Sequence, residues 1–104
     1  MTFKDSSVIV RDIKKELIHA LAVAEDLWQG AGVELVVTSL NDGNHMEGSL
    51  HFEGRAADFR TWNIPSRMLK TRLVEDLRKQ LGPRYDVVVE KDHIHLEWDP
   101  KEAA

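Results

Sequence analysis

The middle of the chain carries the stretch Gly48-Ser49-Leu50-His51-Phe52-Glu53-Gly54-Arg55-Ala56-Ala57-Asp58. It places His51 seven positions before Asp58, with small residues between the two side chains. Gly54 lets the chain turn there, because glycine adopts positive φ without steric cost. We expect the rest of the chain to be a scaffold that brings this stretch to a second polar one near the C-terminus.

The second stretch is Asp92-His93-Ile94-His95. Alternate side chains of a strand share a face, so His93 and His95 could face one cleft. His51, Asp58 and His95 would then offer two nitrogens and one oxygen to a divalent ion. Three such ligands are typical of a catalytic zinc site, which keeps its fourth position for water. From spacing alone, a polar strand face without metal remains an open alternative.

The composition limits the class of protein. The 104 residues suit one domain, residues 1–104, with a core over about residues 8–98. The net charge of −4, with acids and bases interleaved, argues against a nucleic-acid partner. No cysteine is present, which excludes disulfides and thiolate zinc sites. No apolar run follows the N-terminus that would suit a signal peptide or a membrane span.

Two amphipathic helices are predicted. The first begins near Val8, where serines can cap it, and ends at Gly30 and Gly32. The second follows Pro65, a residue suited to a first helical turn, and ends at Gly82. Its apolar stripe consists of Met68, Leu69, Leu73, Leu77 and Leu81. The first helix presents the stripe Ile13, Leu17 and Leu21. We expect this stripe to be buried, together with Leu69, Leu73 and Leu77 of the second helix.

Four strands are predicted, at residues 33–38, 55–60, 85–89 and 93–98, from β-branched runs and turn signals. The last two are joined by the short turn at Lys91-Asp92, so this pair must be antiparallel. The order of elements predicts an α+β fold, with a small, mostly antiparallel sheet and helices packed on one side.

The motif Ser49-x-His51-x-x-Gly54-x-Ala56-x-Asp58, followed by Asp92-x-x-His95, resembles the signature of the zinc D-alanyl-D-alanine carboxypeptidase family. That family includes phage endolysin peptidases. The sequence from Ser49 to Asp58 resembles even more closely the amino-terminal signalling domain of hedgehog proteins, which shares the peptidase fold and zinc site. The resemblance covers roughly residues 10 to 98 and implies a hedgehog/D-Ala-D-Ala-peptidase-like fold.

The resemblance implies a role for each site residue. His51, Asp58 and His95 would bind one Zn²⁺. Asp92 matches the acid that the carboxypeptidases place three residues before the last ligand. Glu90 competes for this role, since hedgehog domains carry a glutamate further upstream. Simple strand parity puts neither acid on the face of the two histidines.

Two further histidines receive implied roles. His93 would lie beside the metal and donate to an oxyanion or to substrate. His45 matches a hedgehog histidine near the cleft and would bind substrate, or else be a solvated loop histidine.

Two departures from the families matter. No arginine or lysine lies between Thr38 and Leu50, where the carboxypeptidases bind the substrate carboxylate. An internal peptide bond is therefore at least as fitting a substrate as a free C-terminal D-alanine. Hedgehog domains also bind calcium through an acid-rich loop in this region. Only Asp42 and Glu47 remain here, so we expect that calcium site to be weak or absent.

The sequence thus predicts a monomeric zinc metallopeptidase that hydrolyses peptide bonds in bacterial peptidoglycan stems or cross-links. Zinc would activate water, and Asp92 or Glu90 would act as general base. The chain would be made in the cytoplasm and reach the cell wall by another export or lysis route. The alternative is a non-catalytic, zinc-containing, hedgehog-like binding module.

Overall fold

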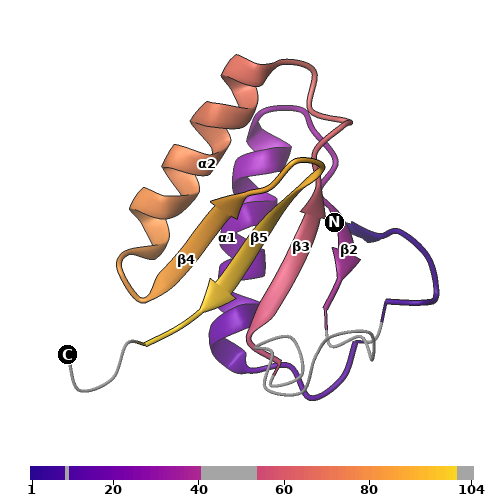
Figure 1. Ribbon diagram of the computed structural model, residues 1–104, viewed down its shortest axis with the longest axis vertical. Coiled ribbons are helices and arrows are strands. Elements are labelled where there is room, and N and C mark those ends of the chain that lie inside the picture. The colour runs from indigo at the N-terminus through magenta and orange to yellow at the C-terminus, as the bar shows by residue number, and fades with distance from the viewer. Residues whose placement is uncertain (9, 41–53, 101–104) are drawn as a thin grey trace.

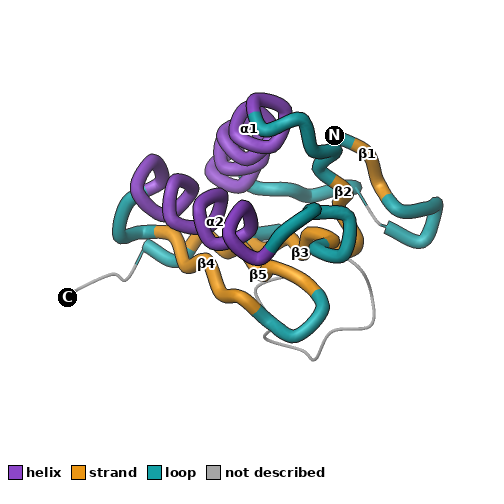
Figure 2. The backbone as a smooth tube through the Cα atoms, turned by 90° about the horizontal axis from the view of Figure 1, so that it is seen from above, coloured by secondary structure: helices purple, strands orange, loops and turns teal. Residues whose placement is uncertain are grey.

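Two helices cover one face of a sheet in the computed structural model, which describes residues 1–8, 10–40 and 54–100 (Figure 1). The described elements are β1 (Thr2–Phe3), α1 (Lys15–Gly30), β2 (Val36–Ser39), β3 (Ala56–Arg60), α2 (Arg67–Leu81), β4 (Tyr85–Val89) and β5 (His93–Trp98). Figure 2 shows both helices on the same side of the strands.

The sheet is mixed and has the order β1-β2-β3-β5-β4. β1 and β2 are parallel, and the other three neighbouring pairs are antiparallel. The predicted α+β class and the helices on one side are confirmed. The sheet gains a parallel pair because the unpredicted β1 adds to β2, where the Thr2 N–H donates to the Leu35 carbonyl at 2.8 Å.

The core lies between the helices and the sheet. Phe59, Ile94 and Leu96 point from β3 and β5 toward the helices and are fully buried. Trp28 of α1 meets Phe59 edge to face, with 5.8 Å between ring centroids. Alternation along the strands therefore sends Asp58, His93 and His95 to the face that the helices leave uncovered.

Helix α1 begins at Lys15, seven residues later than predicted. Asp12 has φ 55°, which is incompatible with a right-handed helix, and the Lys14 N–H donates to the Gly54 carbonyl at 3.0 Å. Contact with a distant segment therefore sets the start of α1. Leu17 and Leu21 of the predicted stripe are buried, whereas Ile13 precedes the helix and is half-buried.

Helix α2 follows Ser66, whose Oγ accepts from the Leu69 N–H at 3.1 Å, an N-cap. Leu73 and Leu77 are buried as predicted. Met68 is 83% exposed, so its place in the stripe was wrong. It lies in the first turn, one position off the line through Leu69, Leu73 and Leu77 that faces the core.

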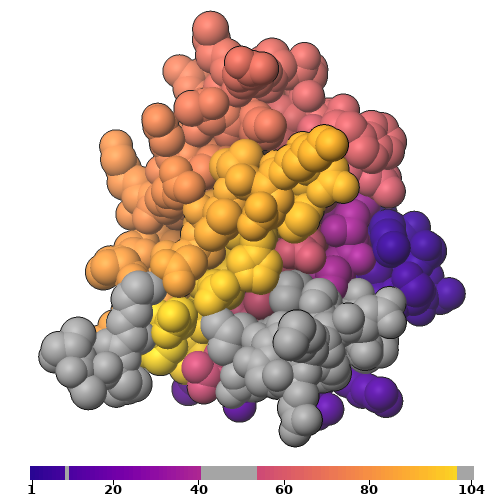
Figure 3. Space-filling view, in the orientation of Figure 1, coloured from indigo at the N-terminus to yellow at the C-terminus, as the bar shows by residue number. Residues whose placement is uncertain are grey.

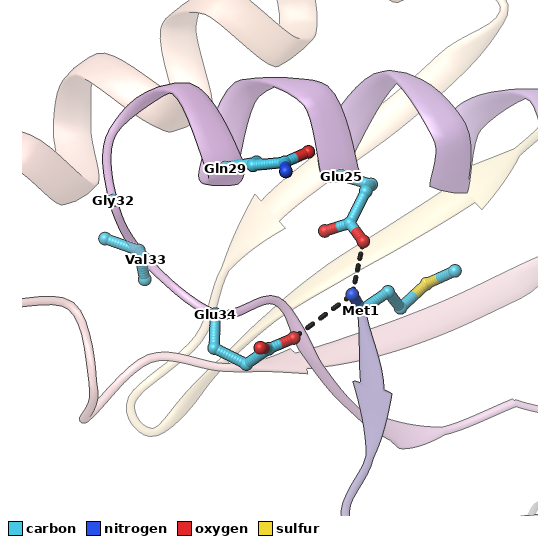
Figure 4. A pocket seen from close by; sticks show the side chains of 6 residues that line it. All are labelled: Met1, Glu25, Gln29, Gly32, Val33 and Glu34. Carbon is cyan, nitrogen blue, oxygen red and sulfur yellow. Dashed lines mark hydrogen bonds and ion pairs between the residues drawn. The ribbon is translucent and has the colours of Figure 1, made fainter.

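The N-terminal segment is attached to α1 by charge. The Met1 ammonium group pairs with the carboxylate of Glu25 on α1 and with that of Glu34 at 3.1 Å (Figure 4). Hydrogen bonds to these two carboxylates, first to Glu25, raise the pKa of the amino group. These contacts hold the start of β1 close to the helix.

Candidate functional site

Asp58 on β3 and His95 on β5 are directly paired across the sheet. The Nδ1 atom of His95 lies 2.9 Å from Oδ1 of Asp58, and both side chains are largely buried. The structure thus brings together two of the three predicted zinc ligands. His51, the third, lies outside the described residues.

The second ring nitrogen of His95 is held by Glu97, whose Oε1 lies 2.7 Å from Nε2. Hydrogen bonding to Asp58, and then to Glu97, raises the pKa of His95 against the opposing effect of burial. Glu97 was not among the predicted site residues. Its signal was the two-residue spacing from His95, which puts both side chains on one face of a strand.

This arrangement fits a zinc ligand. A metal-binding histidine commonly donates its other ring N–H to a carboxylate, which fixes the ring and its tautomer. His95 directs one nitrogen toward Asp58 and has the other on Glu97. A nitrogen and a carboxylate oxygen are donors that Zn²⁺ prefers. Asp58 and His95 would hold the ion together with His51.

A set of carboxylates continues from Glu97. Oxygen atoms of Asp86, Glu97 and Asp99 lie within 4.8 Å of one another, so this acidic cluster could hold a metal ion. A set of oxygen donors alone suits a hard cation better than zinc. The loop acids weighed for calcium, Asp42 and Glu47, lie outside the described residues.

His93 and Asp92 form a pair beside Asp58. His93 Nδ1 lies 2.7 Å from Asp92 Oδ1, and His93 Nε2 lies 3.9 Å from Asp58 Oδ1. Asp92 is in the turn between β4 and β5 with an 85% exposed side chain. The hydrogen bond from His93 lowers the pKa of this carboxyl group.

Glu90, the other predicted acid, lies one residue past the end of β4 and is exposed. Strand parity had predicted that Glu90 lies off the face of His93 and His95, and this was wrong. Val88 pairs with His95, and the Glu90 N–H donates to the His93 carbonyl at 2.8 Å, so Glu90 lies on the face of both histidines. His45 lies outside the described residues.

A surface hollow of about 270 Å³ opens beside Asp58 and His93. Arg60, Trp62 and Lys4 also border it. The N-terminal segment, the end of β3 and the β4–β5 hairpin thus meet on the face seen in Figure 3. Asp58, one of the predicted metal ligands, therefore adjoins an open, polar surface.

Comparison with known proteins shows the family of this chain. The family model of the hedgehog amino-terminal signalling domain matches residues 4–97. Over 82 residues the chain is 32% identical to the Indian hedgehog B protein of Danio rerio. That alignment covers 78% of this chain and 19% of the relative, so the chain spans about a fifth of the relative's length. The chain belongs to the hedgehog amino-terminal signalling domain family.

This membership corrects the predicted function. The matching family is a signalling domain, and neither comparison points to a carboxypeptidase, an endolysin or another hydrolase. The prediction of a zinc metallopeptidase that cleaves peptidoglycan was therefore wrong, as was a peptidoglycan partner. The error arose because the motif from His51 to Asp58 resembles both families, so it indicated a type of site and not the use of that site.

Asp92 and Glu90 were predicted as alternative general bases of a hydrolase. Because the hydrolase prediction was wrong, that role no longer applies to them. In the structure, the Asp92 carboxylate is hydrogen-bonded to His93 at an exposed turn.

No helix in the described ranges has the length and apolar character needed to cross a bilayer.

Proposed function

We propose that this chain is a protein-recognition module of the hedgehog signalling type, in which one zinc ion held by His51, Asp58 and His95 stabilises the recognition face. The placement of His95 between Asp58 and Glu97 carries the zinc part of this proposal. Family membership over residues 4–97 supports the signalling part. The hedgehog/D-Ala-D-Ala-peptidase-like name of the fold stays a prediction.

Zinc would act here as a cross-link and a source of charge. A bound ion would replace the proton that His95 shares with Asp58, and it would join β3 and β5 to the stretch that contains His51. The ion would also neutralise the Asp58 carboxylate next to the hollow. The resulting face would be more rigid and less acidic, which favours selective contact with a partner protein.

The zinc part is tested by metal analysis of purified protein after dialysis against trace zinc. Wild type should retain about one ion per chain, as a single three-ligand site requires. The variants His51→Ala, Asp58→Asn and His95→Ala should each lose most of it. His19→Ala removes an exposed histidine on α1 and should bind as wild type does. Full occupancy in the ligand variants would refute the assignment.

The signalling part is tested with fluorescently labelled protein on cells that display hedgehog receptors and on matched cells that lack them. Saturable binding should require the receptors. It should be lost in the Asp58→Asn and His95→Ala variants and retained in His19→Ala. Equal binding to both cell types would reject a receptor-binding role.

A further inference from the structure

Trp62 is an exposed aromatic residue on a firmly held turn. Its side chain is 76% exposed, whereas Thr61 and Ile64 of the same turn are buried. The Ile64 N–H closes the turn on the Thr61 carbonyl at 2.9 Å. Asn63 Nδ2 fastens it to the Glu34 carbonyl at 2.8 Å. The ring is therefore presented by a turn that needs little further ordering on binding.

Arg60, the last residue of β3, reaches over this ring. Its guanidinium carbon lies 4.5 Å from the centroid of Trp62. Within the described ranges, no carboxylate forms an ion pair with Arg60. A guanidinium that stacks on an aromatic face keeps its N–H donors available for a carboxylate.

The charges around the hollow divide into two sets. Asp58 and Asp92 are engaged by His95 and His93, at 2.9 and 2.7 Å. Lys4 borders the same hollow as Arg60, and it too forms no ion pair with a carboxylate of the described residues. Two cations and an exposed indole are thus offered to an outside group.

The balance of charge selects the kind of partner. A polyanion such as a sulfated glycan needs a run of cations, and here two cations stand beside two acids on a chain of net charge −4. A polypeptide with one carboxylate next to an apolar side chain matches two cations and an indole better. Trp and Arg are also the residue types that most often dominate the energy of protein interfaces.

We propose that Trp62, Arg60 and Lys4 form a docking surface for an acidic segment of a partner protein. The Trp62 ring covers apolar atoms of that segment, while Arg60 and Lys4 bind its carboxylate. This inference rests on the proposed recognition function and names the partner chemistry for it. It requires no metal, so the two proposals can fail separately.

The test begins with a random dodecapeptide library displayed on phage, selected on the full chain and counter-selected on Trp62→Ala. The recovered peptides should be enriched in Asp or Glu beside an aliphatic or aromatic residue. Recovery of peptides without acidic residues, or of none that distinguish Trp62→Ala from wild type, overturns the proposal.

The best peptide is then synthesised, and its affinity is measured by fluorescence anisotropy. Trp62→Ala and Arg60→Gln should each weaken binding at least tenfold, and Arg60→Lys by less, since the charge remains but the planar contact is lost. Lys4→Gln should weaken it severalfold. Two exposed α2 positions supply controls, Arg67→Gln for charge and Met68→Ala for apolar surface, and both should bind as wild type does.

Three further arms separate the alternatives. Urea midpoints equal to that of wild type should show that the variants are folded. Peptide binding to the protein is measured once with added zinc and once with a chelator. Binding in both conditions supports docking that is independent of the metal. No binding in either condition rejects docking and leaves the zinc proposal intact. A heparin-derived hexasaccharide serves as the glycan probe. If it shifts the Trp62 indole N–H signal in NMR and the acidic peptide does not, the partner is a glycan and the proposal is wrong.

Discussion

Asp58 and His95 face each other across β3 and β5, with 2.9 Å between Oδ1 and Nδ1, although 37 positions separate them in the chain. Glu97 holds the opposite nitrogen of the same imidazole at 2.7 Å. One histidine thus lies between two carboxylates on a sheet face that the helices leave uncovered. This relationship makes the orientation of His95, and with it the proposed zinc affinity, dependent on a residue outside the predicted ligand set.

Replacing Glu97 with glutamine should weaken zinc binding about 10- to 100-fold, because residues that orient a metal-binding histidine typically contribute that much. The dissociation constant can be measured by competition with a chromophoric chelator. Glu90→Gln is the matched control, since it removes a carboxylate from the same face at an exposed position. Equal dissociation constants for the two variants would show that Glu97 does not orient His95.

Gly54→Ala should destabilise the fold by at least about 2 kcal/mol. Gly54 has φ +72°, where a side chain alone costs about 1–2 kcal/mol, and an added Cβ would lie 2.0 Å from the Asp12 carbonyl oxygen. The backbone must therefore move. Gly32→Ala isolates the conformational cost, because φ is +75° there and, among the described residues, no atom beyond the chain neighbours lies within 4 Å of an added Cβ. Urea unfolding of both variants compares them, and equal losses would rule out the steric contribution.

Arg78→Ala should destabilise the protein by about 1 kcal/mol and increase its self-association. Nη2 and Nε of Arg78 donate to the Val87 carbonyl at 2.6 and 3.1 Å, on the open edge of β4. Removing the guanidinium leaves an edge acceptor available to another chain. Urea midpoints and light scattering measure the two effects. Lys79→Ala, the neighbouring change on α2, should stay within about 0.5 kcal/mol of wild type without scattering.

The Asp92 carboxyl group should titrate below its ordinary pKa because His93 donates a hydrogen bond to it. A carboxyl group whose folded-state pKa is depressed adds stability above its unfolded-state pKa, and that contribution is lost as pH falls through the folded-state pKa. Carboxyl ¹³C shifts followed against pH should place the Asp92 pKa higher in His93→Asn than in wild type. His19→Asn should leave it unchanged, and an unaltered pKa in both variants would contradict the hydrogen bond.

Local sequence was sufficient for several elements. The predicted strands at residues 85–89 and 93–98 have the same bounds as β4 and β5, because a short turn and alternating side chains define them without help from distant residues. The buried Leu73 and Leu77 of α2 likewise follow from helical periodicity. The motif from His51 to Asp58 predicts a histidine and aspartate site, but it resembles both the hedgehog and the peptidase families, so spacing could not decide the function.

Long-range contacts decided the remainder. The pairing of Asp58 with His95, the late start of α1 against Gly54 and the addition of β1 to the sheet each depend on segments far apart in the chain. The role of Glu97 depends on the same pairing, because the ring of His95 is oriented only when β3 and β5 are in register. The amino-acid sequence determined which faces are apolar and which residues could bind a metal. Tertiary structure determined which of them meet, because strand register is set by pairing across the sheet and not by neighbours along the chain.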